Sequence, residues 1–396
     1  ISLISNGRIT GGIANGLGGL IQGDGGAAID IALGSIVGST SGTGISNASS
    51  GVIRGTNVAI NVLGSVEGGI SNSGTIEATA SGAAAIHVAG TAASVTGGIS
   101  NAVGGIIAAT SSGDGIQIRF SASLTGGISN SGTITGDHAN GISLLNGASL
   151  IGDITNAVST AVIAGESTGI QLDNATLTGS IVNSGSISGS DNIGVSLSNS
   201  ATITGTITNN SGAVIQGSDY GIRVGSSSDI AGGISNAGRI SGFSSSATGI
   251  YVGSGSGVSS IINSGVIEGG SSTGYGIFMT AGATVAAVTN SGTIEGVDGS
   301  VQFDNGDSTL TLQTNSNLIG GADGGTGTND TLVLEGYGSE NEVFTDFEHL
   351  TVSASTSNTW ALSGNSNFDD LTVNSGTLDI QGTLGSATSL VSVTVA

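Results

Sequence analysis

The stretch GGISNSGTIEA, residues 68–78, is the unit from which this sequence is built. Similar segments follow at residues 97–109 (GGISNAVGGIIAA), 126–136 (GGISNSGTITG) and 232–242 (GGISNAGRISG). Each copy carries only short apolar segments between Gly, Ser and Asn residues, so one copy cannot bury a hydrophobic side by itself. Stability must then come from stacking the copies on one another.

The asparagine of the Ile-x-Asn step gives the period of the repeat. Ten of these asparagines recur at nearly constant spacing, with a period of about 27 residues, which is in the range typical of solenoids. They are Asn47, Asn72, Asn101, Asn130, Asn156, Asn183, Asn209, Asn236, Asn263 and Asn290. Apolar residues recur about six and two positions before each asparagine and four to six after it. A further segment then follows in forms such as GIQI, GIRV, GIYV and GIFM.

The alternation within each segment has a period of two, which indicates strands with one buried face. We predict an all-β fold, a single-stranded right-handed parallel β-helix (β-solenoid) with about 27 residues and three short strands per coil, in about 15 coils whose strands lie about 4.8 Å apart. Ile99, Ile128, Ile181 and Ile234 are expected to point inward. The repeated asparagine is predicted to be a turn residue that tolerates a left-handed backbone and whose amide bonds the same amide one coil away, while glycine supplies positive φ at the other corners.

Composition excludes several classes of protein. The 396 residues include 74 glycines, no proline and no cysteine, so disulfides and thiolate metal sites are excluded. A hydrophobic fraction of 37% with only 8% charged residues argues against disorder. The five basic residues are dispersed arginines set against 27 acids, so no basic stripe for nucleic acid is expected. No apolar run is long enough for a membrane span.

The pattern changes from about residue 297, where DTLVLEGYG (330–338), FEHLTV (347–352), TWALSG (359–364) and LTVNSGTLDIQG (371–382) follow one another. Together with the ISNSGTI repeats, this series resembles the passenger domain of a bacterial autotransporter, the type V secretion family. The resemblance covers essentially the whole chain, and the series near the end is its more specific part. It suggests two regions, repetitive coils over 1–296 and a β-helical continuation over 297–396 that resembles the membrane-proximal part of a passenger.

The resemblance implies a place and a function. Passengers of this family are right-handed β-helices exported to the cell surface through a C-terminal outer-membrane barrel, which is therefore expected downstream of this sequence. The chain is expected to be extracellular or on the bacterial cell surface. Its expected function is structural and adhesive: cell-surface adhesion, aggregation or biofilm and matrix formation, possibly as a filament. Its partner would be a second copy of itself or a surface receptor.

No catalytic, cofactor-binding or metal-ligating residue is predicted. His87, His138 and His349 lie in different coils with no second histidine or acid at ligand spacing. Asp307 and Ser308 belong to a Gly-Asp-Ser step that resembles the nucleophile motif of serine-protease passengers. That motif continues with Gly where this chain has Thr-Leu, so no protease site is expected.

Two acidic features suggest calcium. Asp323 and Asp330 lie in GGADGGTGTNDTLVL (320–334), which faintly resembles the nonapeptide calcium repeat; tandem copies are needed to share each ion, so a plain turn is predicted. Glu268 and Glu295 are expected to stack on adjacent coils. Either Ca²⁺ binds such acidic rows on the surface, or solvent and salt screen the pair.

A polysaccharide-degrading enzyme on the same scaffold is the alternative function. Such sites need clustered acids, a basic residue and aromatic platforms for sugars on one strand face. The aromatic residues here are mostly single, and the relevant acids are scattered: Asp153, Asp173, Asp191, Asp219 and Asp229. A non-enzymatic protein is therefore predicted. Three or more acids and an arginine converging on neighbouring coils would favour the enzyme instead.

Overall fold

The computed structural model describes residues 1–4, 6–40, 42–82, 84–304, 306–385 and 392–395. Residues Ile1–Gly217 and Ser218–Ala396 form two compact units. Every regular element in these ranges is a β-strand. Accordingly, none of the described residues forms a helix of the length and apolarity that a membrane crossing requires.

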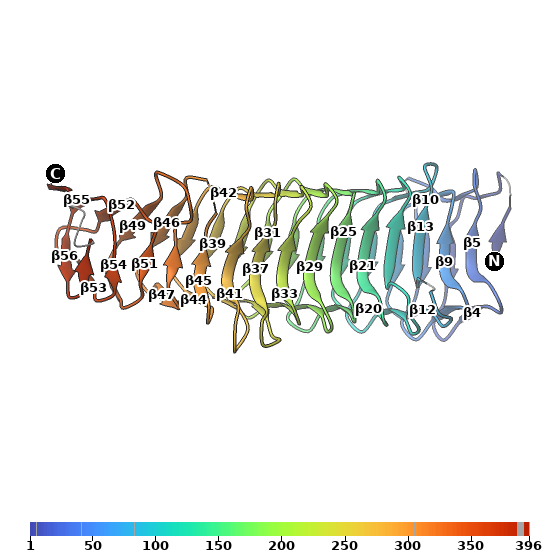
Figure 1. Cartoon of the computed structure of the whole chain (residues 1–396). Coiled ribbons are helices and arrows are strands. Elements are labelled where there is room, and N and C mark those ends of the chain that lie inside the picture. Colours follow the sequence, from blue (N-terminus) through green and yellow to red (C-terminus); the bar gives the residue numbers. More distant parts are fainter. Residues whose placement is uncertain (5, 41, 83, 305, 386–391, 396) are drawn as a thin grey trace. The chain divides into compact units, whose positions relative to one another are not determined.

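In the first unit, each turn of the chain contributes one strand to each of four parallel sheets, here called A to D, and each sheet has eight strands in this unit (Figure 1). Sheet A contains β1 (Ser2–Leu3), β5 (Ala27–Ile31), β9 (Val58–Val62), β13 (Ile86–Ala89), β17 (Ile116–Arg119), β21 (Asn140–Leu145), β25 (Thr168–Asp173) and β29 (Ile193–Ser198). Sheet B contains β2 (Arg8–Ile9), β6 (Ile36–Gly38), β10 (Ser65–Glu67), β14 (Ser94–Thr96), β18 (Ser123–Thr125), β22 (Ser149–Ile151), β26 (Thr176–Thr178) and β30 (Thr202–Ile203). Sheet C contains β3 (Ile13–Asn15), β7 (Ile45–Asn47), β11 (Ile70–Asn72), β15 (Ile99–Asn101), β19 (Ile128–Asn130), β23 (Ile154–Asn156), β27 (Ile181–Asn183) and β31 (Ile207–Asn209). Sheet D contains β4 (Leu20–Gly23), β8 (Val52–Gly55), β12 (Thr75–Ala78), β16 (Ile106–Ala109), β20 (Thr133–Gly136), β24 (Val162–Gly165), β28 (Ser186–Gly189) and β32 (Val214–Gly217).

The second unit begins with the same four-sided turns. Its sheet A contains β33 (Tyr220–Val224), β37 (Thr248–Val252), β41 (Tyr275–Met279), β45 (Gly299–Gln302), β48 (Ala322–Asp323) and β51 (Phe344–Thr345). Sheet B contains β34 (Asp229–Ile230), β38 (Gly257–Val258) and β42 (Thr284–Val285). Sheet C contains β35 (Ile234–Asn236), β39 (Ile261–Asn263), β43 (Val288–Asn290), β46 (Thr309–Leu312), β49 (Thr331–Glu335), β52 (His349–Ser353), β55 (Asp370–Ser375) and β58 (Ser392–Val395). Sheet D contains β36 (Arg239–Gly242), β40 (Val266–Glu268), β44 (Thr293–Glu295) and β47 (Asn317–Ile319). Two small sheets follow, β50 (Gly338–Glu340), β53 (Thr359–Leu362) and β56 (Thr377–Ile380) in one, β54 (Asn365–Ser366) and β57 (Thr383–Leu384) in the other.

The predicted parallel β-solenoid with about 27 residues per turn is confirmed. Each regular turn, however, has four strands rather than three. Corresponding residues pair from turn to turn, as in Ile70 with Ile99 and Ile99 with Ile128. Eight four-sided turns in the first unit, three in the second and one further turn without a sheet B strand give about 12, fewer than the expected 15 or so. The right-handed sense and the boundary at 296/297 stay predictions.

The turns shorten after Asn290. Val288 pairs with Leu310, and Leu332 pairs with Leu350. Fewer residues separate these partners than separate the partners of a regular turn. Over this part of the second unit, large buried aromatic side chains join the aliphatic core. They are Phe303, Phe344, Phe347, Trp360 and Phe368.

The core of each regular turn is a stack of aliphatic side chains. The four isoleucines predicted to point inward, Ile99, Ile128, Ile181 and Ile234, are all at most 2% exposed. Because each of these side chains packs between the equivalent residues of neighbouring turns, the apolar surface that one turn leaves open is covered by the next. The hydrophobic effect therefore acts along the stack and not within one repeat.

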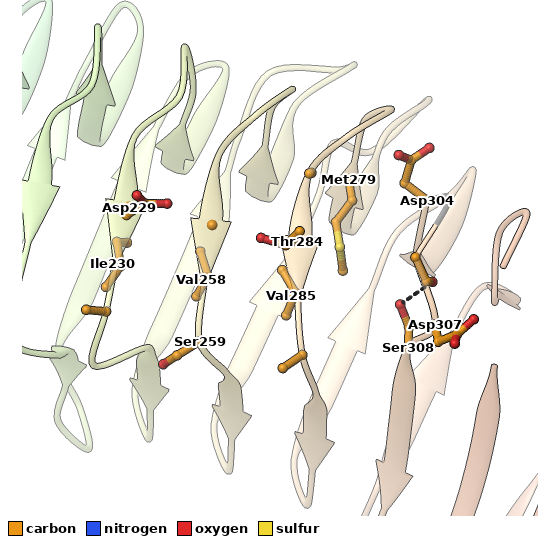
Figure 2. A pocket seen from close by; sticks show the side chains of 15 residues that line it. Asp229, Ile230, Val258, Ser259, Met279, Thr284, Val285, Asp304, Asp307 and Ser308 are labelled. Atoms are coloured by element: carbon orange, nitrogen blue, oxygen red, sulfur yellow. Dashed lines mark hydrogen bonds between the residues drawn. The ribbon is translucent and has the colours of Figure 1, made fainter. Parts of the chain in front are cut away.

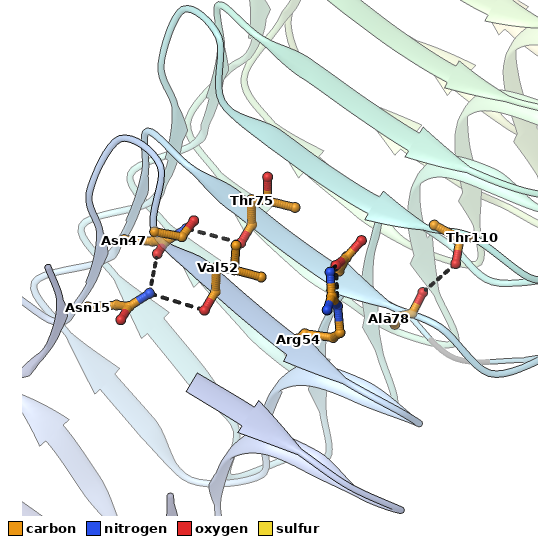
Figure 3. Close-up of polar contacts among 9 residues, drawn as sticks. Asn15, Asn47, Val52, Arg54, Thr75, Ala78 and Thr110 are labelled. Carbon is orange, nitrogen blue, oxygen red and sulfur yellow. Dashed lines mark hydrogen bonds and ion pairs between the residues drawn. The ribbon is translucent and has the colours of Figure 1, made fainter. Parts of the chain in front are cut away.

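The predicted asparagine ladder exists, but its asparagines belong to strands and not to turns. Asn15 Nδ2 donates to Asn47 Oδ1 at 2.8 Å (Figure 3). Asn47 Nδ2 donates in turn to Asn72 Oδ1 at 2.8 Å. These asparagines end the sheet C strands and are buried, and none has a positive φ. The left-handed corner is supplied by glycine: at Gly69 (φ 78°) a Cβ would come within 2.7 Å of two carbonyl oxygens.

Candidate functional site

Four aromatic side chains gather on the outward face of sheet A in the second unit. This aromatic strip consists of Tyr220 on β33, Tyr251 on β37, and Tyr275 and Phe278 on β41. Ring centroids are 5.1 Å apart for Tyr220 and Tyr251, 6.0 Å for Tyr251 and Phe278, and 4.6 Å for Tyr275 and Phe278. All four side chains are half-buried. The strands alternate, so Ile250 and Ile277 beside them point into the core.

Strand pairing places part of this strip in a straight row. The row runs by Cα pairing from Arg223 through Tyr251, Phe278 and Gln302 to Asp323, with one residue per turn. We call these five residues the sheet A row. Its members are half-buried, and the Arg223 guanidinium lies 5.8 Å from the Tyr251 ring centroid, within cation–π range. The row therefore has a cation at one end, aromatic rings in the middle, and an amide and a carboxylate at the other end.

A polar hollow adjoins the strip at Tyr275. This ring lies against Gly299, where a Cβ would come 3.2 Å from its edge. Beyond it, Asp298, Gln302 and Asp323 line a hollow of about 140 Å³. Backbone amides hold both acids, since Gly274 N donates to Asp298 Oδ2 and Gly325 N to Asp323 Oδ1, each at 2.8 Å.

The hydroxyls of Tyr220 and Tyr275 are protonated at neutral pH, and their surroundings favour this form. Burial raises the pKa of Tyr220, with further contributions from Tyr251 and Asp219 and an opposing one from Arg223. Burial likewise raises the pKa of Tyr275, assisted by Asp298 and Asp323. Both hydroxyls can therefore donate hydrogen bonds as well as accept them.

The expectation that the aromatic residues are mostly single is wrong for this face. The signal was present in GIRV, GIYV and GIFM, whose third letters are Arg223, Tyr251 and Phe278. Stacking the repeats puts these residues side by side. Asp219 belongs to this surface too. The other scattered acids lie elsewhere. The carboxylate of Asp153 accepts a hydrogen bond from Ser180 N, and the carboxylate of Asp173 accepts one from the Asn199 side chain. The backbone N of Asp191 donates to Glu166 O, and Asp229 lines the cavity described below.

The structure brings His138 together with two acids in the first unit. Its Nδ1 lies 2.6 Å from Glu166 Oε2, and one ligand atom each of Asp137, His138 and Glu166 lie within 4.8 Å of one another. The statement that no acid lies at ligand spacing from a histidine is therefore wrong, because Glu166 follows His138 by one turn of the solenoid. An imidazole nitrogen and two carboxylates could hold a divalent metal ion, although His138 is 63% exposed and already paired with Glu166.

His87 belongs to a chain of hydrogen bonds on sheet A of the first unit. Arg119 Nε donates to His87 Nε2 at 3.0 Å, so Nδ1 carries the proton and donates to Asn61 Oδ1 at 2.9 Å. Asn61 Nδ2 in turn donates to Asp30 Oδ1 at 2.8 Å. Burial, assisted by the Arg119 charge and opposed by Asp114, lowers the pKa of His87 to about 4. This histidine is a neutral structural bridge.

A cavity of about 430 Å³ lies beside the last strand of sheet B, β42 (Figure 2). Ile230, Val258, Met279 and Val285 form its apolar part, and Asp229, Asp304, Asp307 and Ser308 also line it. The 15 described lining residues include no histidine. Ser308 is buried and its hydroxyl donates to Gly306 O at 3.2 Å, so its proton is held by a backbone carbonyl and not by a side-chain base of the kind that activates a nucleophile.

Asp330 is a buried carboxyl. Its Oδ1 accepts from Ser308 N at 2.6 Å, whereas Oδ2 has no hydrogen-bond partner within the part of the chain that the structure describes. Burial raises the pKa of Asp330 to about 6, with contributions from Glu348, Asp307 and Asp323 and opposition from the Ser308 amide. The carboxyl therefore ties residue 308 to residue 330 across one turn.

Glu268 and Glu295 stack on adjacent turns as predicted, since they are paired in the register of β40 and β44. Arg239, one turn before Glu268, forms an ion pair with it. Arg54 and Glu77 form a similar pair in the first unit (Figure 3). Arg239 therefore offsets part of the repulsion between the two carboxylates, and calcium binding there stays a prediction.

Comparison with known proteins adds no relative. No protein-family model matches this sequence, and neither the curated proteins nor the solved structures include a significant match.

Proposed function

We propose that this chain is an extracellular, structural and adhesive β-solenoid of the autotransporter passenger type, which mediates adhesion of a cell surface. The aromatic strip on the outward face of sheet A carries the proposal. The aliphatic core is complete without it, since Ile250 and Ile277 are fully buried beneath these strands. Large aromatic side chains and arginine are what contact surfaces concentrate.

The rest of the fold supports a binding scaffold. Each outward row is held by parallel strand pairing above and below, so a side chain on it has a fixed position relative to the next turn. The buried asparagine ladder adds a second set of bonds between turns. Such preorganisation lowers the entropy lost on binding.

Adhesion of the purified chain to cells tests the proposal. The whole chain is coupled to beads, and bead attachment and clumping of bacterial cells are scored. We expect attachment that falls at least fivefold for Tyr251→Ser with Phe278→Ser. Phe243→Ser is the matched control, because Phe243 is 50% exposed and lies outside the strip. Equal attachment of all these beads and of uncoated beads contradicts an adhesive function.

A polysaccharide-degrading enzyme remains the second candidate function, because one observation favours it. Asp219 and Arg223 lie near Tyr220, and Asp298 and Asp323 near Tyr275, so three acids and an arginine surround the strip. Release of new reducing ends from a polysaccharide, lost in Asp298→Asn, would establish the enzyme in place of the adhesin.

A further inference from the structure

We infer that the sheet A row, Arg223 to Asp323, is the binding site for one extended, essentially neutral carbohydrate chain. The inference rests on the proposed adhesive function and names the class of ligand that this surface takes. The row lies within the second unit.

The spacing of the row fits a linear polymer. Successive residues of the row sit on neighbouring parallel strands, about 4.8 Å apart, so four steps cover about 19 Å. One step is close to the length of a pyranose unit in an extended β-1,4-linked chain. Successive sugar units can therefore meet Tyr251, Phe278 and Gln302 in turn, with alternate units presenting opposite faces of the ring.

The chemistry of the row fits sugars. A pyranose ring offers a face of C–H groups and a rim of hydroxyls. The C–H groups are slightly positive and are attracted to aromatic rings, and Tyr251 and Phe278 place half-buried rings on the outward face of the sheet. The hydroxyls need donors and acceptors, which the Gln302 amide and the Asp323 carboxylate provide.

The polar hollow beside Tyr275 supplies the same chemistry to one side of the row. Asp298 and Asp323 each use one oxygen on a backbone amide, at 2.8 Å. A carboxylate can accept several hydrogen bonds, so each acid retains acceptor capacity for sugar hydroxyls. Charge-assisted hydrogen bonds of this kind are stronger than neutral ones.

The charges select among carbohydrates. Asp219, Asp298 and Asp323 surround the strip, Arg223 stands at one end, and the chain as a whole carries −22. A polyanionic polysaccharide is repelled by such a surface. A neutral chain avoids this repulsion, and one acidic sugar is accommodated only beside Arg223.

Binding of defined oligosaccharides to the purified full chain tests the inference. The probes are neutral β-1,4-linked hexasaccharides of glucose, mannose and N-acetylglucosamine, measured by calorimetry. Maltohexaose, which coils, serves as the conformational control. We expect at least one β-1,4-linked probe to bind at least tenfold more tightly than maltohexaose. Its affinity should increase with chain length up to about five units, one for each residue of the row, and then level off.

Variants assign the binding to the row. Tyr251→Ala and Phe278→Ala should each weaken it at least tenfold, and Gln302→Ala about threefold. Phe243→Ala should leave the affinity unchanged. The altered side chains are outward, so circular dichroism and the melting temperature should stay close to those of the parent chain. Equal binding by Tyr251→Ala and the parent would place the site elsewhere and overturn the inference.

The outcomes separate this inference from the proposed function. If beads adhere and lose adhesion in the Tyr251→Ser, Phe278→Ser variant, while no β-1,4-linked probe binds, the strip is adhesive but the carbohydrate class is wrong. If a probe binds the row and is cleaved, the carbohydrate class is right and the adhesive function is wrong. Failure of both adhesion and probe binding overturns both.

Discussion

The side-chain amide of Asn101 donates to Oδ1 of Asn130, one turn further along the chain, at 2.8 Å. The same Nδ2 also donates to Gly105 O and Thr133 O at 3.1 Å. Both asparagines are at most 1% exposed. A buried amide is costly unless its donors and acceptor are satisfied, and here Gly105 of the same turn and residues of the next turn accept its hydrogen bonds.

Replacing one asparagine of the ladder should therefore affect both neighbouring turns. Asn130→Leu keeps the branched shape of the side chain but removes one of the three acceptors of Asn101 Nδ2 and the side-chain donor to Asn156 Oδ1. We expect a loss of about 2 to 4 kcal/mol in the free energy of unfolding, measured by urea titration. Asn374→Leu, at an exposed strand asparagine, should change stability by less than about 0.5 kcal/mol. Equal effects would show that the ladder adds nothing beyond the strands.

Adjacent residues on opposite faces of β19 offer a test of the core. Ile128 is 1% exposed and Ser129 is exposed. Ile128→Asp should cost about 4 kcal/mol or more, because it buries an unpaired carboxyl between turns. Ser129→Asp should be close to neutral. Thermal melting followed by circular dichroism compares them, and a similar drop for both would mean that the assignment of faces is wrong.

Acidification should destabilise the first unit through His87. Its pKa is about 4 in the folded chain against an ordinary value of 6.5. Below pH 6.5 the unfolded chain takes up a proton that the folded chain refuses, so stability is lost as pH falls from 6.5 to 4. In His87→Gln this part of the pH dependence should vanish. Hydrogen exchange of β13 amides at pH 7, 5.5 and 4.5 follows it; identical profiles would contradict the structural role of the neutral imidazole.

Glu340 should give the second unit the opposite pH dependence, with stability lost as the pH rises. It is 3% exposed, and burial raises its pKa to about 8, assisted by Glu342 and opposed by the Leu318 amide. The protonated form is favoured in the folded state, so the contribution of Glu340 to the free energy of unfolding is complete below pH 4.5 and is lost as pH rises through 8. Glu340→Gln should make this unit more stable at pH 8 and unchanged at pH 4.5. Exchange of β50 amides provides the measurement; no gain at pH 8 would count against the raised pKa.

The repeat itself could be predicted from the sequence, and so could the inward isoleucines. Both depend on a pattern that recurs once in every turn, and a pattern of that kind has few ways to bury Ile99 and Ile128 other than stacking. The number of strands per turn was harder to predict from the sequence. Very short strands at the corners, such as Ser65–Glu67, are defined by pairing with the next turn and not by local propensity.

The functional surfaces needed the tertiary structure. Local sequence determined that Tyr251 alternates with core residues and faces outward. Its position beside Tyr220 and Phe278 depends on the length of each turn, and so does the position of His138 beside Glu166. One extra residue in a loop leaves the strand pattern intact but changes the sequence separation of the residues that meet. The sequence by itself therefore determined which side chains are inside and which are outside. The register between turns, fixed by hydrogen bonds between strands one turn apart, decided which outward side chains meet.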